Sequence, residues 1–203
     1  MVSHYFAKTG KNPEQSLYQY AVGSNGVFVH AKRDNLEACI PVFEMSGKQK
    51  IRGLEEVSPF VKISEIVRLG VFVQLLAEFI KASPGEEVFY GHCTLLRWIF
   101  LKPAQVGALS FVKPINPYPL EAEDAIIEIH SHGCSRAFFS ATDNRDETGF
   151  RIYGVIGNLV KGKWPEILVR VGIFGHYHFV PAKTIFELPE VVYDRYHDFN
   201  GLH

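Results

Sequence analysis

The sequence predicts a mixed α/β (α+β) fold, in which a mixed β-sheet is flanked by helices. Short runs rich in Val, Ile, Phe and Tyr alternate with Gly, Pro and Asn, a pattern typical of strands and turns. Residues 63–80 instead carry apolar side chains at helical spacing. A hydrophobic content of 47% in 203 residues suffices for a packed core.

The chain divides into two predicted regions, a small β-rich N-terminal region (residues 1–62) and a larger domain (residues 63–203). In the first region, residues 19–43 read as a hairpin whose turn is Arg33-Asp34-Asn35. This region carries no chemical motif, and we expect His30 to be an ordinary strand residue.

A core-facing helix is predicted to open the second region. Ser64 is the expected N-cap, and Pro84-Gly85 ends the helix. The stripe expected to face the core contains Ile66, Leu69, Val73, Leu76 and Ile80.

Strands and one further helix follow. We expect strands at residues 94–102 and 107–113, a hairpin formed by residues 151–159 and 167–174, and a short helix within residues 188–199. The three prolines of residues 114–119 suit an exposed loop at the rim of a cleft.

Composition excludes several classes of protein. Twenty-one Lys and Arg against 22 Asp and Glu give a net charge of -1, which indicates no nucleic-acid partner. The most apolar stretch, residues 63–80, contains charged residues and predicts no membrane span. Cys39, Cys93 and Cys134 form no C-x-x-C pair and the N-terminus lacks a signal-peptide pattern, so we expect a reducing cytoplasm.

The strongest chemical signal lies in residues 126–143, where an apolar strand leads to His130 and His132. Side chains two apart on a strand share a face. Ser140 and Asp143 then have the spacing of a helix N-terminus, and that helix could return the Asp143 carboxylate to the imidazoles. Two nitrogens and one oxygen would leave a zinc ion one open position, as in catalytic sites. The plainer alternative is a pair of core or surface histidines followed by a simple helix cap.

The pattern H-x-H-x(7)-S-x-x-D resembles the JAMM motif of the MPN/Mov34 metallopeptidases, also called JAB domains. The resemblance implies a JAB/MPN-like sheet, Zn²⁺ held by His130, His132 and Asp143, and Ser140 as a helper of the oxyanion. Gly133 stands where the family often has proline, and glycine also permits a sharp turn.

The family also has an upstream glutamate as its general base. By resemblance Glu87 fits best, within reach of one water molecule from the metal, with Glu86 as the alternative and Glu128 as a third candidate. Cys134 is a possible additional ligand. His176 and His178 repeat the H-x-H spacing without a following Ser-x-x-Asp.

The resemblance implies a zinc-dependent peptidase or isopeptidase that removes or processes a ubiquitin-like protein by its C-terminal tail. Residues 51–54 and 170–175 add a resemblance to prokaryotic JAB proteins encoded beside E1-like and E2-like partners, including the group called PRTRC system protein A. The alternatives are an inactive MPN scaffold that binds a partner protein and a metal hydrolase acting on a small molecule or DNA.

Overall fold

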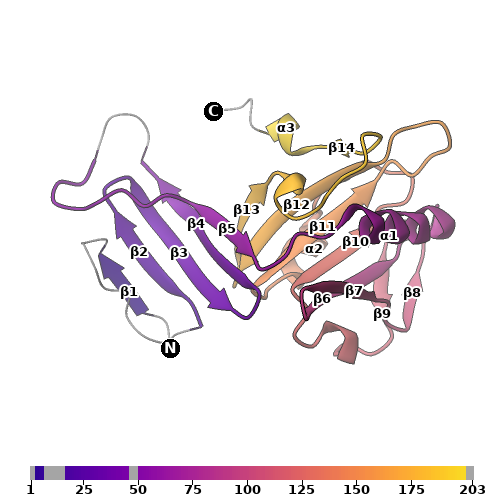
Figure 1. The fold of residues 1–203 in the computed structure, drawn as a ribbon, viewed down its shortest axis with the longest axis horizontal. Coiled ribbons are helices and arrows are strands. Elements are labelled where there is room, and N and C mark those ends of the chain that lie inside the picture. The colour runs from indigo at the N-terminus through magenta and orange to yellow at the C-terminus, as the bar shows by residue number, and fades with distance from the viewer. Residues whose placement is uncertain (1–2, 7–16, 46–49, 200–203) are drawn as a thin grey trace.

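The computed structural model describes residues 3–6, 17–45 and 50–199. These residues form a mixed α+β fold dominated by strands, as the sequence predicts, with two large sheets side by side (Figure 1). No helix in the described ranges is long and apolar enough to cross a membrane.

The first sheet contains five strands in sequence order: β1 (Ser3–Phe6), β2 (Gln19–Gly23), β3 (Gly26–Arg33), β4 (Leu36–Glu44) and β5 (Phe60–Ile63). β1 pairs with β2 in parallel, and the other pairs are antiparallel. The predicted hairpin with its turn at Arg33-Asp34-Asn35 is confirmed as β3 and β4, and Asn35 adopts the left-handed conformation with φ 64°.

The second sheet has the strand order β13-β12-β11-β10-β6-β7, and β14 pairs with β12. Only β10 with β11 and β12 with β14 are parallel. The strands are β6 (Val88–Thr94), β7 (Arg97–Leu101), β10 (Ile127–Ser131), β11 (Arg151–Gly157), β12 (Glu166–Ile173), β13 (His176–Val180) and β14 (Tyr193–Asp194). β11 and β12 are the hairpin predicted between residues 151 and 174.

The two faces of the second sheet differ in chemistry. Ile127 and Ile129 of β10 lie in a buried core that also contains Phe72 of α1 (Leu69–Ala82) and Val29 of the first sheet. The first sheet therefore shares its core with the second, and β4 lies close to β13 (Figure 1). His130, at the alternate position of β10, belongs to the opposite face.

Helix α1 begins later than predicted and buries a different stripe. Its N-cap is Arg68, not Ser64, and the Glu187 carboxylate accepts from the Leu69 backbone N–H at 3.0 Å. Leu76 is buried as predicted, together with Phe72, Leu75 and Phe79, whereas Leu69, Val73 and Ile80 are exposed. Apolar residues surround most of this helix, so helical spacing alone allows more than one buried face, and the face that contains both phenylalanine rings is the one packed into the core.

Two other predicted elements differ from the structure. Residues 107–113 are not one strand, because β8 (Gln105–Gly107) and β9 (Val112–Pro114) form a separate small hairpin across a turn. The C-terminal helix is only α3 (Tyr196–Phe199), preceded by β14. The remaining short elements are α2 (Ala141–Asp146) and the 3-10 turns η1 (Leu120–Ala122) and η2 (Ala182–Thr184).

Candidate metal centre

The two histidines of the H-x-H sequence converge at the end of β10. His130 lies on the strand and His132 directly follows it, and both side chains are buried. Their Nε2 atoms are 3.1 Å apart. At this distance one imidazole can donate a hydrogen bond to the other, or both nitrogens can approach one cation.

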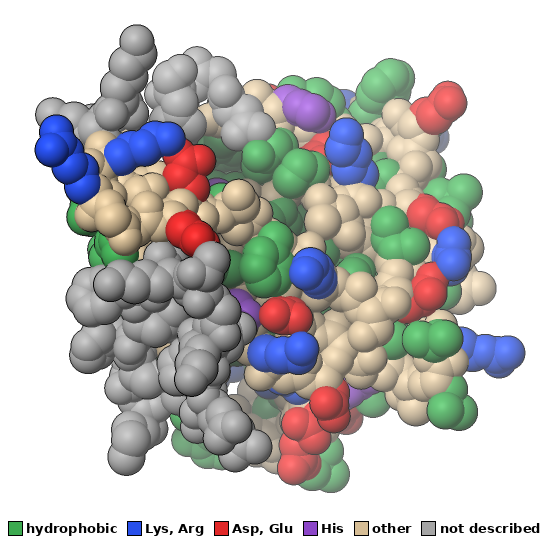
Figure 2. Space-filling view, turned by 60° about the vertical axis from the view of Figure 1, so that its left-hand side comes forward, with side chains coloured by type: hydrophobic (Ala, Val, Ile, Leu, Met, Phe, Trp, Pro, Cys, Tyr) green, Lys and Arg blue, Asp and Glu red, His purple; other side chains and the backbone are tan. Residues whose placement is uncertain are grey.

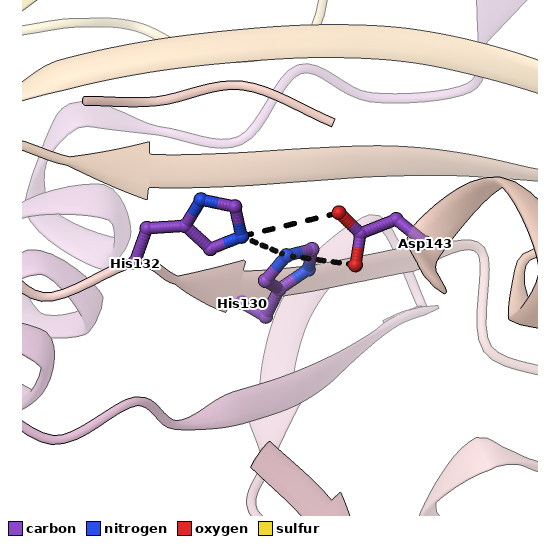
Figure 3. A group of neighbouring side chains, drawn as sticks. All are labelled: His130, His132 and Asp143. Carbon is purple, nitrogen blue, oxygen red and sulfur yellow. Dashed lines mark hydrogen bonds and ion pairs between the residues drawn. The ribbon is translucent and has the colours of Figure 1, made fainter. Parts of the chain in front are cut away.

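Helix α2 supplies the third group. Ser140 and Asp143 form a capping box, in which the Asp143 N–H donates to Ser140 Oγ at 3.2 Å and the Ser140 N–H donates to Asp143 Oδ2 at 2.5 Å. The box points the Asp143 carboxylate at the imidazoles, with Oδ1 3.5 Å from His130 Nε2 and Oδ2 3.9 Å from His132 Nε2 (Figure 3).

These three ligand atoms lie within 4.8 Å of one another, so the group could hold a metal ion. The predicted convergence of His130, His132 and Asp143 is therefore confirmed as geometry. Two imidazoles and one carboxylate are a donor set typical of catalytic zinc.

The turn after the second histidine requires glycine. Gly133 has φ +48°, and a Cβ at this position would collide with the carbonyl oxygen of Pro84. Proline, whose φ is fixed near −65°, could not adopt this conformation. The local backbone therefore requires glycine at position 133.

Burial sets the protonation of the histidines. It lowers the pKa of His130 to about 4, and it also lowers that of His132, while the charge of Asp143 acts in the opposite direction on both. Both imidazoles are therefore neutral near pH 7, the form that binds metal.

The acidic pair before β6 separates onto two sides of the chain. Glu86 is buried and lines the same cavity as the histidines and Asp143. Burial, and next the charge of Asp143, raise its pKa to about 7. Glu87 does not line that cavity and forms an ion pair with Lys102 at a smaller pocket of about 240 Å³, which Glu86 also lines. The lining of the larger cavity therefore favours Glu86, the alternative candidate, over Glu87, which was preferred from the sequence.

The other sequence candidates lie outside the metal group. Glu128 lines the cavity but pairs with Arg151 at 3.0 Å. Cys134 is exposed, and like Cys39 and Cys93 it is a free thiol. His176 Nε2 forms a hydrogen bond with the Tyr20 hydroxyl at 2.8 Å. Within the described residues, neither H-x-H histidine of β13 nor Cys134 joins a potential metal group.

The cavity has a volume of about 1070 Å³. Val88 and Tyr90 of β6 and His130 of β10 line it on the sheet side, and Thr142 and Asp143 of α2 line it on another. The loop of residues 109–120 forms a further wall, as expected of its proline-rich part. This wall exposes large apolar side chains, namely Leu109, Phe111, Tyr118 and Leu120.

The face drawn in Figure 2 carries charged side chains of both signs. On the described part of the face drawn in Figure 2, Lys and Arg side chains are interspersed with Asp and Glu.

One buried charged residue of this region was not predicted from the sequence. Arg170, in the middle of β12, is buried and binds two residues of the α2 segment. The available signal was a single charge inside the otherwise apolar run of residues 167–173.

Comparisons with known proteins add no family. No protein-family model matches the chain, and a search of curated proteins finds no similar sequence.

Proposed function

We propose that this protein is a zinc-dependent peptidase or isopeptidase of the JAMM type with a JAB/MPN-like fold. One observation carries the proposal: His130, His132 and Asp143 converge within 4.8 Å in a cavity that also holds the buried carboxyl of Glu86. Two imidazoles, a carboxylate ligand and a second carboxyl group are the parts that metal-assisted hydrolysis of an amide requires.

The chain's own residues supply the proton transfers. When bound, zinc would act as a Lewis acid toward a water molecule and the substrate carbonyl. Glu86, in place of Glu87, takes a proton from the attacking water and gives it to the departing amine. A pKa of about 7 suits both halves of this exchange near neutral pH.

Ser140 has a hydroxyl proton available for the oxyanion. Its Oγ accepts the N–H of Asp143 within the capping box, which leaves the O–H free to donate to another acceptor. Ser140 also lines the cavity. A donor of this kind contributes about 3 kcal/mol to stabilising the transition state.

The substrate in this proposal is a ubiquitin-like protein, cleaved at its C-terminal tail in a bacterial conjugation system with E1-like and E2-like partners, in the cytoplasm. The resemblance of the motif supplies this substrate class. The cavity is consistent with it, because a volume of about 1070 Å³ and the apolar side chains of residues 109–120 suit part of a polypeptide.

Cleavage of a ubiquitin-like protein with a C-terminal extension tests the proposal. The zinc-loaded wild type should release the extension, and Glu86→Gln should lower kcat by about 10² to 10⁴. Glu87→Gln is the matched control, because it changes the neighbouring carboxyl outside the cavity, and should retain most activity. Loss of activity in Glu87→Gln with full activity in Glu86→Gln would contradict the assignment of the base.

The exposed apolar wall also fits a second candidate, an inactive MPN scaffold that binds a partner protein. Zinc content separates the two candidates, because the scaffold requires no metal. A purified protein that neither retains nor binds zinc would support the scaffold.

A further inference from the structure

Arg170 is a charged residue buried in β12 of the second sheet. Its residue is 3% exposed, and every position of β12 is buried. It shares the sheet face of His130, since it lies opposite Tyr153, which in turn lies opposite Glu128 of β10. A cation in such a position is costly unless its donors are satisfied.

Two residues of the α2 segment satisfy those donors. Nε and Nη2 of Arg170 donate to Glu147 Oε2 at 3.0 and 2.5 Å, and Nη1 donates to Asn144 Oδ1 at 2.5 Å. Asn144 is the residue directly after Asp143, and Glu147 ends the helix. One guanidinium therefore binds α2 at two points.

Two aromatic rings fix the guanidinium. Phe139 and Tyr177 have their ring centroids 3.8 and 4.1 Å from the Arg170 Cζ. The Tyr177 hydroxyl is within hydrogen-bonding distance of the carbonyl oxygens of Asn144 and Glu147, at 2.9 and 2.7 Å. The stacking partner of Arg170 is thus also a partner of the helix backbone.

Within the part of the chain that the structure describes, helix α2 makes few other stabilising contacts. It contains six residues, none of them buried, and helices this short are unstable without external contacts. Its capping box fixes Asp143 relative to Ser140, but it does not attach the helix to the sheet. The contacts of Arg170 and Tyr177 do.

We propose that Arg170, stacked between Phe139 and Tyr177 and bound to Asn144 and Glu147, is a positioning residue for the metal centre. It holds α2 at the distance from β10 at which the Asp143 carboxylate meets His130 and His132. Residues that hold metal ligands in place without contacting the metal commonly change the affinity of a site for its metal. The inference rests on the metal centre of the proposed function, but not on peptidase activity.

A purely structural role would give a different result. Such a role would lower the melting temperature and leave the zinc affinity of the folded protein unchanged. A positioning role weakens zinc binding in protein that is still folded, because the third ligand is displaced. The two roles are therefore separable by measuring zinc affinity well below the melting temperature.

The experiment measures the zinc dissociation constant by competition with a chromophoric chelator, using the full chain and Zn²⁺ alone. Arg170→Lys keeps the charge but loses the two-point contact and the planar stacking, and should weaken binding about 10- to 100-fold. Tyr177→Phe keeps the ring and loses only its hydroxyl, and Asn144→Ala removes one acceptor of Arg170. Each should weaken binding by a smaller factor.

Ile40→Val is the matched control. This change removes a buried methylene from the core shared by the two sheets, at a position far from α2 along the chain. It should therefore lower the melting temperature without changing zinc affinity. A folded Arg170→Lys protein with wild-type zinc affinity would overturn the inference. If Arg170→Lys does not fold, wild-type zinc affinity in both Tyr177→Phe and Asn144→Ala would overturn it.

The outcome is distinguishable from failure of the proposed function. A wild type that binds zinc, loses affinity in the three variants and cleaves no ubiquitin-like fusion supports the positioning role and contradicts the peptidase. A wild type that binds no zinc overturns both.

Discussion

The buried hydroxyl of Ser131 accepts a hydrogen bond from the backbone N–H of Glu87 at 3.1 Å, and the Ser131 N–H donates to the Glu87 carbonyl at 2.9 Å. Ser131 stands between the two metal-site histidines. These two bonds fix the start of β6 against the end of β10. They thereby fix Glu86 toward the cavity and Glu87 away from it.

Replacing Ser131 tests this connection. Ser131→Ala leaves a buried N–H without its acceptor, and should lower the free energy of unfolding by about 1 to 3 kcal/mol, measured by denaturant titration. It should also reduce kcat, because Glu86 is held less firmly. Ser64→Ala is the surface control, and should stay within about 0.5 kcal/mol of the wild type. Equal stability of the two variants would remove Ser131 from this role.

Metal binding should stabilise the protein. A ligand that binds only the folded state adds about 2.7 kcal/mol at a concentration 100 times its dissociation constant. Zinc should therefore raise the melting temperature of the wild type, a chelator should reverse the rise, and zinc added back should restore it. His130→Ala and Asp143→Ala should abolish the response, as measured by calorimetry.

His176→Ala is the control for the metal response. It removes an imidazole from the second H-x-H sequence, outside the metal group. Its melting temperature should still rise with zinc. A zinc response that persists in His130→Ala and disappears in His176→Ala would locate the metal at β13 instead.

Glu86 should make the stability of the metal-free protein depend on pH. Its pKa is about 7 in the folded protein and about 4.3 in an unfolded chain, so between these values only the folded state holds the proton. Stability therefore falls as pH rises through this window, and the cost persists above pH 7. Glu86→Gln removes the charge, and should be more stable than wild type by about 1 to 3 kcal/mol at pH 8, with little difference at pH 4.5.

Thermal unfolding at both pH values, in chelator, measures this difference. Glu87→Gln is the matched control and should show no such gain, because it loses the ion pair with Lys102. A gain in Glu87→Gln alone would mean that the buried uncompensated carboxyl is Glu87.

The convergence of His130, His132 and Asp143 could be predicted from the sequence because it depends on local geometry. Strand alternation places His130 on one face, His132 follows at the same spacing, and the capping box between Ser140 and Asp143 is a property of four consecutive residues. No comparable local rule decides whether Glu86 or Glu87 faces the cavity. That choice depends on the pairing of β6 with β10, which brings together residues about 40 positions apart.

The same reason explains the errors in α1 and the omission of Arg170. Helical spacing allowed more than one stripe for α1. Contacts of Phe79 with Phe89 on β6, and of Phe72 with the sequence-distant Phe186, select these two rings for the core. The burial of a charge at Arg170 depends on its partner Glu147 at the end of α2, which lies 23 residues earlier in the chain. Local sequence patterns predicted the secondary-structure elements and the candidate metal-binding residues. The contacts that hold these residues in place arise from tertiary packing and could not be predicted from local patterns.

Gly133 allows conformational strain and steric collision to be separated. Gly133→Ala places a Cβ both at φ +48° and against the carbonyl of Pro84. Gly162→Ala, at φ +81°, introduces only the backbone strain of a positive φ, because nothing lies within 4 Å of the added Cβ. Strain of this kind costs about 1 to 2 kcal/mol, which is the expected loss in Gly162→Ala. Gly133→Ala should lose more, because backbone atoms must also move.

The position of this turn connects the strain to the metal centre. Gly133 follows His132 directly, so a shift that relieves the collision also displaces the second imidazole. Gly133→Ala should therefore weaken zinc binding as well as stability, while Gly162→Ala should leave zinc affinity unchanged. Denaturant titration and chelator competition on the two proteins measure both effects. Equal losses of stability in the two variants, with zinc affinity unchanged in both, would show that the turn tolerates a side chain and does not set the position of His132.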